Sequence, residues 1–372
     1  MQKGKPIIDK EKKIRVGITH GDMNGISYEI IVKALADARI LEMFTPVIYG
    51  LTRVLSYNRK NLNANDFNYN TVRDASYLKS RKINLVNLSE NEIKIEFGKS
   101  VDKAGQFAHD ALKHAVNDLK SDKIDVVVTA PISKENIQSE TFNFPGHTEY
   151  FASEFNSPDY LMLMVSDTLR VGTITGHVPL TDVPKLLTED LIVQKINVLH
   201  QSLVRDFGVQ KPKIALLGLN PHAGENGQIG KEEIDTIIPA INRAKKEGKL
   251  VFGPFPADGF FAGDYRKFDG ILAMYHDQGL IPFKTLAFNQ GVNFTAGLPI
   301  VRTSPAHGTA YDIAGQGIAS EEPLRNAIYL AIDIQNNRTQ YDEVTANPLQ
   351  LGLLRENGRH KEDNSEIADL LD

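Results

Sequence analysis

Three histidines occupy similar places in the sequence, because each follows a short apolar segment rich in residues that favour β-strands. His177 lies in TITGHVPL, His222 in LLGLNPHAGENG and His276 in ILAMYHDQ. In open α/β sheets ligands bind beyond the carboxyl ends of the strands, so three imidazoles in this position can meet at one point. Three neutral nitrogens that leave coordination positions open for substrate suit a catalytic divalent metal ion. Taken singly, each histidine would more often be a hydrogen-bonded turn residue, so it is the repeated context that favours a metal site.

A second group of side chains could bind an anion. Lys284, Asn293 and Arg302 place two cations and an amide on successive segments. His147 and Thr148, in FPGHTEYFA, stand at the start of an expected helix, where a side chain, backbone N–H groups and the helix dipole can together bind a phosphate or carboxylate. Thr148 could instead be only the helix cap. The group predicts an anionic substrate.

Loops rich in glycine and proline add further candidates. One such loop carries His307, Gly308 and Asp312, and its glycines let the backbone approach a ligand closely, although an ordinary loop-to-helix turn would look similar. The first turn of the chain, HGDMNGIS, could face an anion or be a plain strand-to-helix turn, and it lacks the GxGxxG spacing of a dinucleotide site. Asp258, in GPFPADGFF, could hold water, metal or substrate, or only shape its turn.

The segments between these candidates predict an α/β protein with a mainly parallel sheet, because apolar runs typical of buried strands alternate with helices. Strands are expected at Ile14 to Thr19, Pro46 to Tyr49, Asp125 to Ala130, Tyr160 to Val165, Val171 to Thr175, Ile214 to Leu219 and Ile271 to Met274.

Apolar residues at helical spacing predict one helix from about Tyr28 to Leu41 and another from Lys103 to Leu119. His109 and His114 in the second helix are expected on its surface or face rather than as ligands. The polar stretch Ser56 to Lys82 is expected to be a surface excursion, and the charged segment Arg355 to Asp372 to be peripheral or partly disordered.

Composition excludes several classes of function. The 372 residues carry a formal charge of −5, with 42 Lys+Arg against 47 Asp+Glu, so the chain as a whole offers no electrostatic basis for binding nucleic acid or an anionic membrane. There is no cysteine, so a metal would need histidine and carboxylate ligands. The lysine-rich N-terminus lacks the apolar core of a secretory signal, and no apolar run is long enough to span a membrane. We therefore expect a cytoplasmic protein.

Seven blocks of the sequence are more distinctive than any short motif: TAPISKENI, FPGHTEYFA, TGHVPLTDV, LNPHAGENGQIGKEE, GPFPADGFF, AMYHDQGLIPFK and GVNFTAGLPIVRTSPAHGTAYDIAGQGIA. In order and content they resemble the 4-hydroxythreonine-4-phosphate dehydrogenase family of pyridoxal phosphate biosynthesis, and the resemblance runs from about Arg15 to Ile334. It implies a fold like that of isocitrate and isopropylmalate dehydrogenases, with two α/β domains, an interdomain cleft, and NAD bound without a GxGxxG motif.

The resemblance also implies an organisation. Residues 1–140 and 300–372 would form a discontinuous first domain that contributes to NAD binding. Residues 141–299 would form a second domain with the metal and substrate residues and the dimer interface. The protein would be a homodimer whose active site is completed by residues of both subunits.

The same resemblance implies roles for the candidates. His177, His222 and His276 would bind one divalent ion, zinc, magnesium or cobalt. The substrate would be bound by His147, Thr148, Lys284, Asn293 and Arg302, and NAD by the loop with His307, Gly308 and Asp312. The general base is left open between Lys284, Asp258 and a metal-bound water.

The activity implied is NAD-dependent oxidation and decarboxylation of 4-phosphooxy-L-threonine, a small phosphorylated hydroxy-amino acid, to 3-amino-2-oxopropyl phosphate. Three alternatives stay open. They are a dehydrogenase for a threonate or erythronate phosphate, a phosphotransacylase-like enzyme with a similar cleft, and a non-catalytic protein that binds a phosphorylated metabolite.

Overall fold

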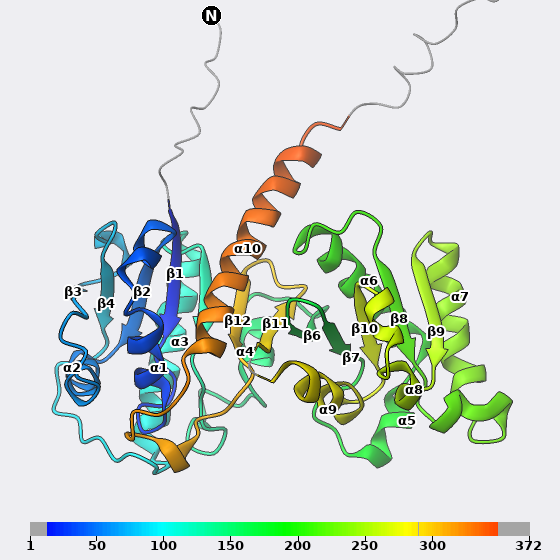
Figure 1. Ribbon diagram of the computed structural model, residues 1–372, viewed down its shortest axis with the longest axis horizontal. Helices are drawn as coiled ribbons and strands as arrows, with labels where there is room; N and C mark the ends of the chain where they lie inside the picture. The colour runs from blue at the N-terminus through cyan, green and yellow to red at the C-terminus, as the bar shows by residue number, and fades with distance from the viewer. Residues whose placement is uncertain (1–12, 289, 349–372) are drawn as a thin grey trace, which may run out of the picture.

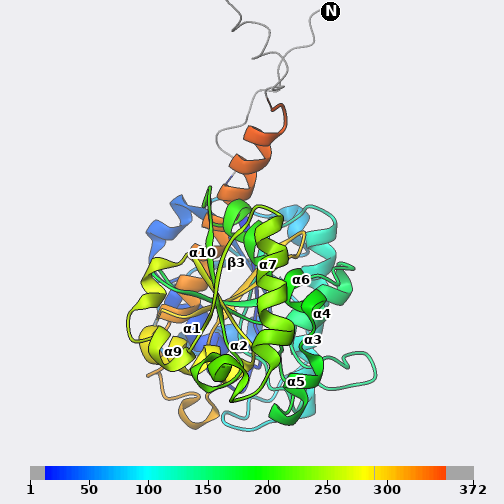
Figure 2. The ribbon, with the colours of Figure 1, turned by 90° about the vertical axis from the view of Figure 1, so that its right-hand side faces the viewer.

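A single twelve-stranded sheet runs through the protein, with helices packed on both of its faces (Figures 1 and 2). The computed structural model describes residues 13–288 and 290–348. Its strands are β1 Ile14–Thr19, β2 Phe44–Gly50, β3 Tyr69–Val72, β4 Ile83–Asn87, β5 Val126–Thr129, β6 Leu161–Val165, β7 Arg170–Thr173, β8 Lys213–Leu217, β9 Leu250–Phe255, β10 Gly270–Ala273, β11 Val292–Ala296 and β12 Val301–Pro305. Its α-helices are α1 Ser27–Ala34, α2 Thr52–Asn61, α3 Asp102–Lys120, α4 His147–Glu154, α5 Val183–Leu186, α6 Glu189–Arg205, α7 Ile238–Lys246, α8 Ala257–Phe260, α9 His276–Ala287 and α10 Glu322–Thr345. The predicted α/β class is confirmed.

The middle of the sheet is antiparallel, which the sequence did not predict. The strand order is β3-β4-β2-β1-β5-β12-β11-β6-β7-β10-β8-β9, and β11 runs antiparallel to both neighbours, as β6 does to β7. Only residues 166–169 separate β6 from β7, and only residues 297–300 separate β11 from β12. Connections this short allow a hairpin but not the crossover that parallel pairing needs. The expectation of a helix between Tyr160 to Val165 and Val171 to Thr175 was therefore wrong.

The strand order also bears on the predicted domains. Strands from residues 1–140 and 300–348 lie on one side of the pair β12–β11, and strands from residues 141–299 lie on the other side. This arrangement is compatible with the predicted division, which stays a prediction.

The two faces of the sheet carry different cores. On one face a single apolar cluster extends across the sheet and includes residues of α1, α6 and α10. On the other face there are two separate clusters, one around α3 and α4 and the other around α9 and strands β7 and β10. The gap between these two clusters lies over the central antiparallel strands. A face with a break in its core is where a ligand can enter.

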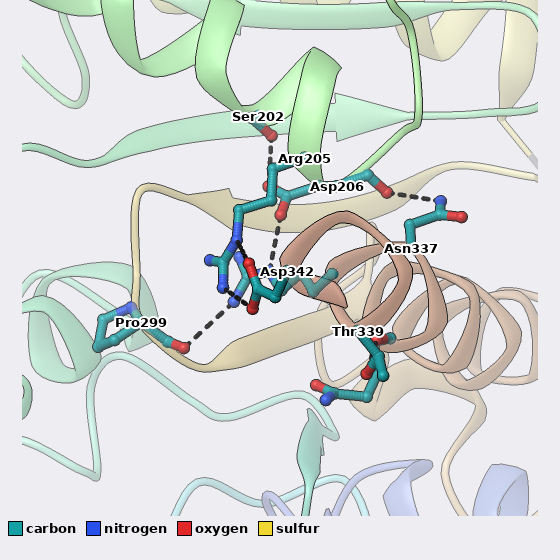
Figure 3. Close-up of polar contacts among 9 residues, drawn as sticks. Ser202, Arg205, Asp206, Pro299, Asn337, Thr339 and Asp342 are labelled. Atoms are coloured by element: carbon teal, nitrogen blue, oxygen red, sulfur yellow. Dashed lines mark hydrogen bonds and ion pairs between the residues drawn. The ribbon is translucent and has the colours of Figure 1, made fainter. Parts of the chain in front are cut away.

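Helix α10 is fastened to α6 and to the turn before β12 by a buried polar network (Figure 3). Nε of Arg338 donates to Oδ1 of Asp206 at 2.6 Å, and both side chains are buried. Ser202 donates to the same carboxylate at 2.6 Å, and Nη1 of Arg338 donates to the carbonyl of Pro299 at 3.3 Å. The network fixes the turn that joins β11 to β12, and Figure 1 shows the last turns of α10 projecting beyond the body of the protein.

Two sequence expectations about the N-terminal region are corrected. The helix expected from Tyr28 to Leu41 ends at Ala34, because Asp37 accepts a hydrogen bond from the backbone of Arg39 at 2.9 Å and so starts a separate 3₁₀ turn, Ala38–Glu42. The stretch Ser56 to Lys82 is more than a surface excursion, since it contains most of α2 and the edge strand β3. An edge strand needs few apolar residues, and that hid it in the sequence.

The long helix predicted from Lys103 to Leu119 is confirmed as α3. On it, His114 is exposed as expected, but His109 is buried, with its ring edge-on to Phe142 at 5.2 Å between centroids. The expectation for His109 was wrong because α4 and the segment before it cover that side of the helix. The segment Arg355 to Asp372 lies outside the described residues. Within the described part of the chain, no helix is both long enough and apolar enough to cross a membrane.

Candidate active site

A cavity of about 300 Å³ lies over the central antiparallel strands. Its floor consists of side chains from four adjacent strands. Alternate residues of a strand point to one face, and the register pairs Asn293 of β11 with Ser304 of β12 on one side and Met164 of β6 on the other. These residues therefore face the cavity together with others two positions away. The floor is formed by Thr129, Met162, Met164, Asn293, Arg302 and Ser304.

Two helices form opposite walls. The first turn of α4 contributes His147, Thr148 and Glu149. Helix α9 contributes His276, Leu280 and Lys284, which are spaced by four and so lie on one helix face. His177 and the loops that follow β5 and β12 complete the lining, and these loops include Lys134 and His307.

Arg302 is the most unusual residue of the floor, because its guanidinium is 1% exposed and is held by hydroxyl groups alone. Nε and Nη2 donate to Oγ1 of Thr129 at 3.2 and 2.7 Å, and Nη1 donates to Oγ1 of Thr295 at 3.4 Å. Burial lowers the pKa of Arg302 to about 9, an effect that the charge of Glu149 opposes. A buried cation without a carboxylate partner is costly, so this site is completed by an anionic ligand.

Three buried polar atoms around the cavity have no hydrogen-bond partner among the described residues. They are Nε2 of His147, Oδ1 of Asn293 and Nε2 of His307. Burial, with the nearby charges of Arg302 and Lys134, holds the pKa of His147 well below its usual value, so its imidazole is neutral at neutral pH. Leaving such groups unsatisfied costs about 1–3 kcal/mol each, so the cavity is suited to a polar ligand.

Two of the three predicted metal ligands meet at the cavity. The ring centroids of His177 and His276 are 5.2 Å apart. Burial and the charges of Lys134 and His276 lower the pKa of His177, which keeps its imidazole available as a ligand. Nδ1 of His276 lies 2.7 Å from Oδ1 of Asp277, and such a contact holds the proton on Nδ1 and leaves Nε2 as an acceptor. The chemistry of this pair fits a divalent metal ion.

The third predicted ligand lies elsewhere. His222 belongs to the segment Pro221–Gly227, does not line the cavity, and forms a 2.7 Å contact with Glu225 that raises its pKa. Asp258, at the start of α8, is also exposed and outside the cavity, and its charge adds to the raised pKa of His222. Within the described ranges no three histidine or acidic side chains are grouped so as to hold a metal ion. The three-histidine site therefore stays a prediction.

The predicted cofactor loop borders the cavity through His307 and Gly308, whereas Asp312 is exposed and lies outside it. A smaller apolar cavity of about 220 Å³ lies between α9 and this loop and shares Lys284 and His307 with the first cavity. A ligand with one apolar part and one polar part could therefore extend across both.

The first turn of the chain supports this loop rather than lining the cavity. The backbone N–H of Ile26 donates to the carbonyl of Thr309 at 3.0 Å. A Cβ on Gly25 would lie 2.6 Å from that same carbonyl oxygen, so the close approach requires glycine. Lys33, on α1, donates to the carbonyls of Gly317 and Ala319 at 2.9 and 2.7 Å.

Sequence reasoning did not propose some residues that line the cavity. Lys134 follows a strand end as the histidines do, and the same rule could have identified it. Glu149 lies one residue after Thr148 in the first turn of α4, where a carboxylate is usually explained by the helix dipole alone.

Comparison with known proteins follows from this geometry. A family model described as "Pyridoxal phosphate biosynthetic protein PdxA" matches residues 42–331. A 4-hydroxythreonine-4-phosphate dehydrogenase of Bacteroides thetaiotaomicron is 49% identical over 92% of this chain and 94% of its own length. A relative from Oceanobacillus iheyensis, whose name gives D-threonate 4-phosphate dehydrogenase as its expected activity, is 38% identical over 87% of this chain and 99% of its own.

Solved structures give the same result. The crystal structure of a 4-hydroxythreonine-4-phosphate dehydrogenase from Burkholderia phymatum matches with a TM-score of 0.72 and 35% identity, over 87% of this chain and 99% of that one. The enzyme of the same name from Klebsiella pneumoniae matches with a TM-score of 0.73 and 34% identity, over 87% of this chain and 100% of that one.

Proposed function

Because the chain belongs to the family of pyridoxal phosphate biosynthetic protein PdxA, we propose that it is an NAD-dependent 4-hydroxythreonine-4-phosphate dehydrogenase. Its substrate is 4-phosphooxy-L-threonine, and its product is 3-amino-2-oxopropyl phosphate. The observation that carries the proposal is the buried Arg302, which has no carboxylate partner within the described chain and lies in a cavity that also holds Lys134 and Lys284. A substrate with a phosphate and a carboxylate supplies the missing negative charge.

The reaction balances as an oxidation followed by a decarboxylation. The C3–H bond breaks as hydride leaves for NAD, the C3 hydroxyl proton passes to a base, and the resulting β-keto acid loses carbon dioxide. Lys284 lines the cavity and Asp258 of the same chain does not, so Lys284 is the better placed of the two proposed bases. Arg302 binds an anionic end of the substrate with its planar group, and the neutral imidazole of His147 donates or accepts one hydrogen bond.

NAD is the proposed oxidant. The apolar cavity between α9 and the loop from His307 supports a binding place for a nucleotide, because it opens beside the polar cavity and shares Lys284 and His307 with it. Gly308 lets the loop approach a ligand closely.

A divalent metal ion is proposed at His177 and His276, with His222 as third ligand. When bound, such an ion lowers the pKa of the substrate hydroxyl and polarises the keto group during decarboxylation. Replacing any one histidine by alanine should reduce bound metal and activity together, and full metal occupancy in two of the three variants would exclude the assignment.

A homodimer with a shared active site is proposed as the means of completing this set. His222 and Asp258 are both exposed, their charges interact, and neither reaches the cavity of its own chain. A second copy of the chain could place this pair at the cavity. His222 of the partner subunit would then join His177 and His276.

Co-expression of two inactive variants tests the shared site. If the ligands come from two subunits, a dimer of His222→Ala with His276→Ala contains one intact site and one doubly defective site. About a quarter of the wild-type activity should return in a statistical mixture of dimers. If all three ligands come from one chain, every site stays defective and no activity returns.

The substrate is tested by comparing NADH formation from 4-phosphooxy-L-threonine and from D-threonate 4-phosphate on the same metal-loaded preparation. The relative from Oceanobacillus iheyensis keeps the second compound as the alternative substrate. A kcat/KM at least about tenfold higher for D-threonate 4-phosphate would overturn the substrate assignment and leave the fold and the oxidative chemistry in place.

A further inference from the structure

Glu149 is the single acidic residue that lines the cavity in the described part of the chain. The other charged residues of the lining are the cations Lys134, Lys284 and Arg302. Within the described residues, no hydrogen bond or ion pair engages the Glu149 carboxylate. A lone carboxylate among three cations calls for a separate explanation.

The position of Glu149 in a helix explains part of its presence. It lies in the first turn of α4, where a negative charge stabilises a helix by about 0.3–1 kcal/mol. A capping box would go further and have the carboxylate accept from the backbone N–H of Gly146, but the cap residue of α4 makes no side-chain hydrogen bond. The helix dipole accounts for a carboxylate in this turn and not for its place in the lining of a cationic cavity.

The charge of Glu149 acts on both ends of the cavity. It opposes the lowering of the Arg302 pKa by burial, in the floor. It also opposes the lowering of the His177 pKa by burial and by Lys134, in the wall where a metal ion is proposed. The carboxylate therefore lies between the anion-binding floor and the pair His177 and His276. A substrate that spans the two must pass it.

The proposed substrate has three charged groups, a phosphate, a carboxylate and an ammonium at C2. The cavity offers three cations for the two anions and one carboxylate for the ammonium. We propose that Glu149 binds the C2 ammonium of the substrate and thereby selects the amino acid over the hydroxy acid of the same skeleton. This inference rests on the proposed function and names the residue that sets its specificity.

The physical basis of the selection is a charge-assisted hydrogen bond. An ammonium donates to a carboxylate with full charge complementarity, whereas a hydroxyl at C2 donates without it and leaves the carboxylate partly desolvated beside an uncharged group. A binding site built around a charged partner discriminates strongly against an analogue that lacks the charge. The 4-hydroxyl phosphate, the C1 carboxylate and the C3 hydroxyl are common to both compounds, so none of their binding residues provides this discrimination.

The variant Glu149→Gln tests the proposal, because glutamine has the same shape without the charge. For 4-phosphooxy-L-threonine, kcat/KM should fall at least about tenfold, while for D-threonate 4-phosphate it should stay within about threefold of wild type or rise. The dissociation constants of both compounds, measured by calorimetry without NAD, should change in the same direction as kcat/KM. The KM for NAD should not change.

Two further variants serve as references. Glu149→Asp keeps the charge and should keep the preference for the amino acid, with a smaller loss than Glu149→Gln. Glu154→Gln, at the other end of the same helix, removes a surface carboxylate that pairs with Lys120 at 2.8 Å and should leave the ratio of the two kcat/KM values at the wild-type value.

The outcomes separate this inference from the proposed function. If wild type forms NADH from neither compound, or prefers D-threonate 4-phosphate about tenfold, the substrate assignment fails, and the calorimetric ratio still tests Glu149. If wild type is active as proposed and Glu149→Gln weakens both compounds equally, the carboxylate has a general role and the specificity inference is overturned.

Discussion

The phenol of Tyr311 donates a 2.8 Å hydrogen bond to the buried carboxylate of Asp22, and this contact joins the proposed cofactor loop to the first turn of the chain. Asn136 donates to the same carboxylate oxygen at 2.7 Å. The first turn, which the sequence left open between an anion site and a plain turn, thus holds the loop that borders both cavities. Its function is to position the loop.

The variant Tyr311→Phe tests this role. A hydrogen bond to a charged group is worth about 1.5–3 kcal/mol, so the KM for NAD should rise by about tenfold while the KM for substrate changes little. Steady-state kinetics with each reactant varied in turn provides the measurement. Tyr77→Phe, at an exposed tyrosine remote from the loop, is the control. An equal rise in both KM values would instead indicate a general loss of structure.

Arg302 offers a second test, because lysine preserves its charge and removes its planar shape. The guanidinium donates two hydrogen bonds to Thr129 and one to Thr295, and a lysine could not keep this arrangement while also binding an anion at two points. We expect Arg302→Lys to lower kcat/KM by about tenfold or more, which corresponds to about 1.4 kcal/mol, with nearly unchanged affinity for NAD. Arg243→Lys, at the surface, should behave as wild type. Loss of cofactor and substrate binding to the same extent would point to a structural role for Arg302.

The sequence identified most residues of the cavity because local rules decide where they lie. His276 and Lys284 share a face of a helix that begins where β10 ends, and Asn293 and Arg302 lie on strands whose alternation points them to one side. His147 and Thr148 were found as a helix start. These rules need no knowledge of the tertiary structure.

Other features could not be predicted by local rules. The antiparallel pairing of β6 with β7 depends on a hairpin turn that resembles any polar loop in the sequence. His222 has the same strand-end context as His177 and His276, yet its segment carries it away from the cavity of its own chain. Whether a second copy returns it to a site is a property of the assembly, which no pattern within one chain encodes.

The ion pair between Asp206 and Arg338 provides a prediction about stability (Figure 3). Asp206→Ala leaves the guanidinium of Arg338 buried and unpaired, so the free energy of unfolding should fall by about 3–5 kcal/mol in chemical denaturation. The double variant Asp206→Leu with Arg338→Met should lose less than the single variant, because it removes both charges. Asp342→Ala breaks the exposed pair with Arg205 nearby and should cost less than about 1 kcal/mol. Equal losses in Asp206→Ala and Asp342→Ala would contradict the assignment of the buried pair as the stronger tie.

His20 predicts how stability depends on pH. Its ring is fully buried, stacks on Tyr28 with 5.2 Å between centroids, and contacts the carbonyl of Phe107 through Nε2 at 3.1 Å, while Nδ1 has no partner among the described residues. Burial lowers the pKa of His20 from 6.5 to about 4. Between these values the unfolded chain takes up a proton and the folded protein does not. The free energy of unfolding should therefore decrease as the pH falls from about 6.5 towards about 4, with a contribution from His20 of up to about 1.4 kcal/mol per pH unit. His20→Gln keeps a donor for the carbonyl of Phe107 and removes the titrating group, so urea denaturation at a series of pH values should give a shallower slope than wild type in this window. His114→Gln, at an exposed histidine of α3, is the matched control. A slope in His20→Gln equal to that of wild type would show that His20 does not titrate differently in the folded and unfolded states.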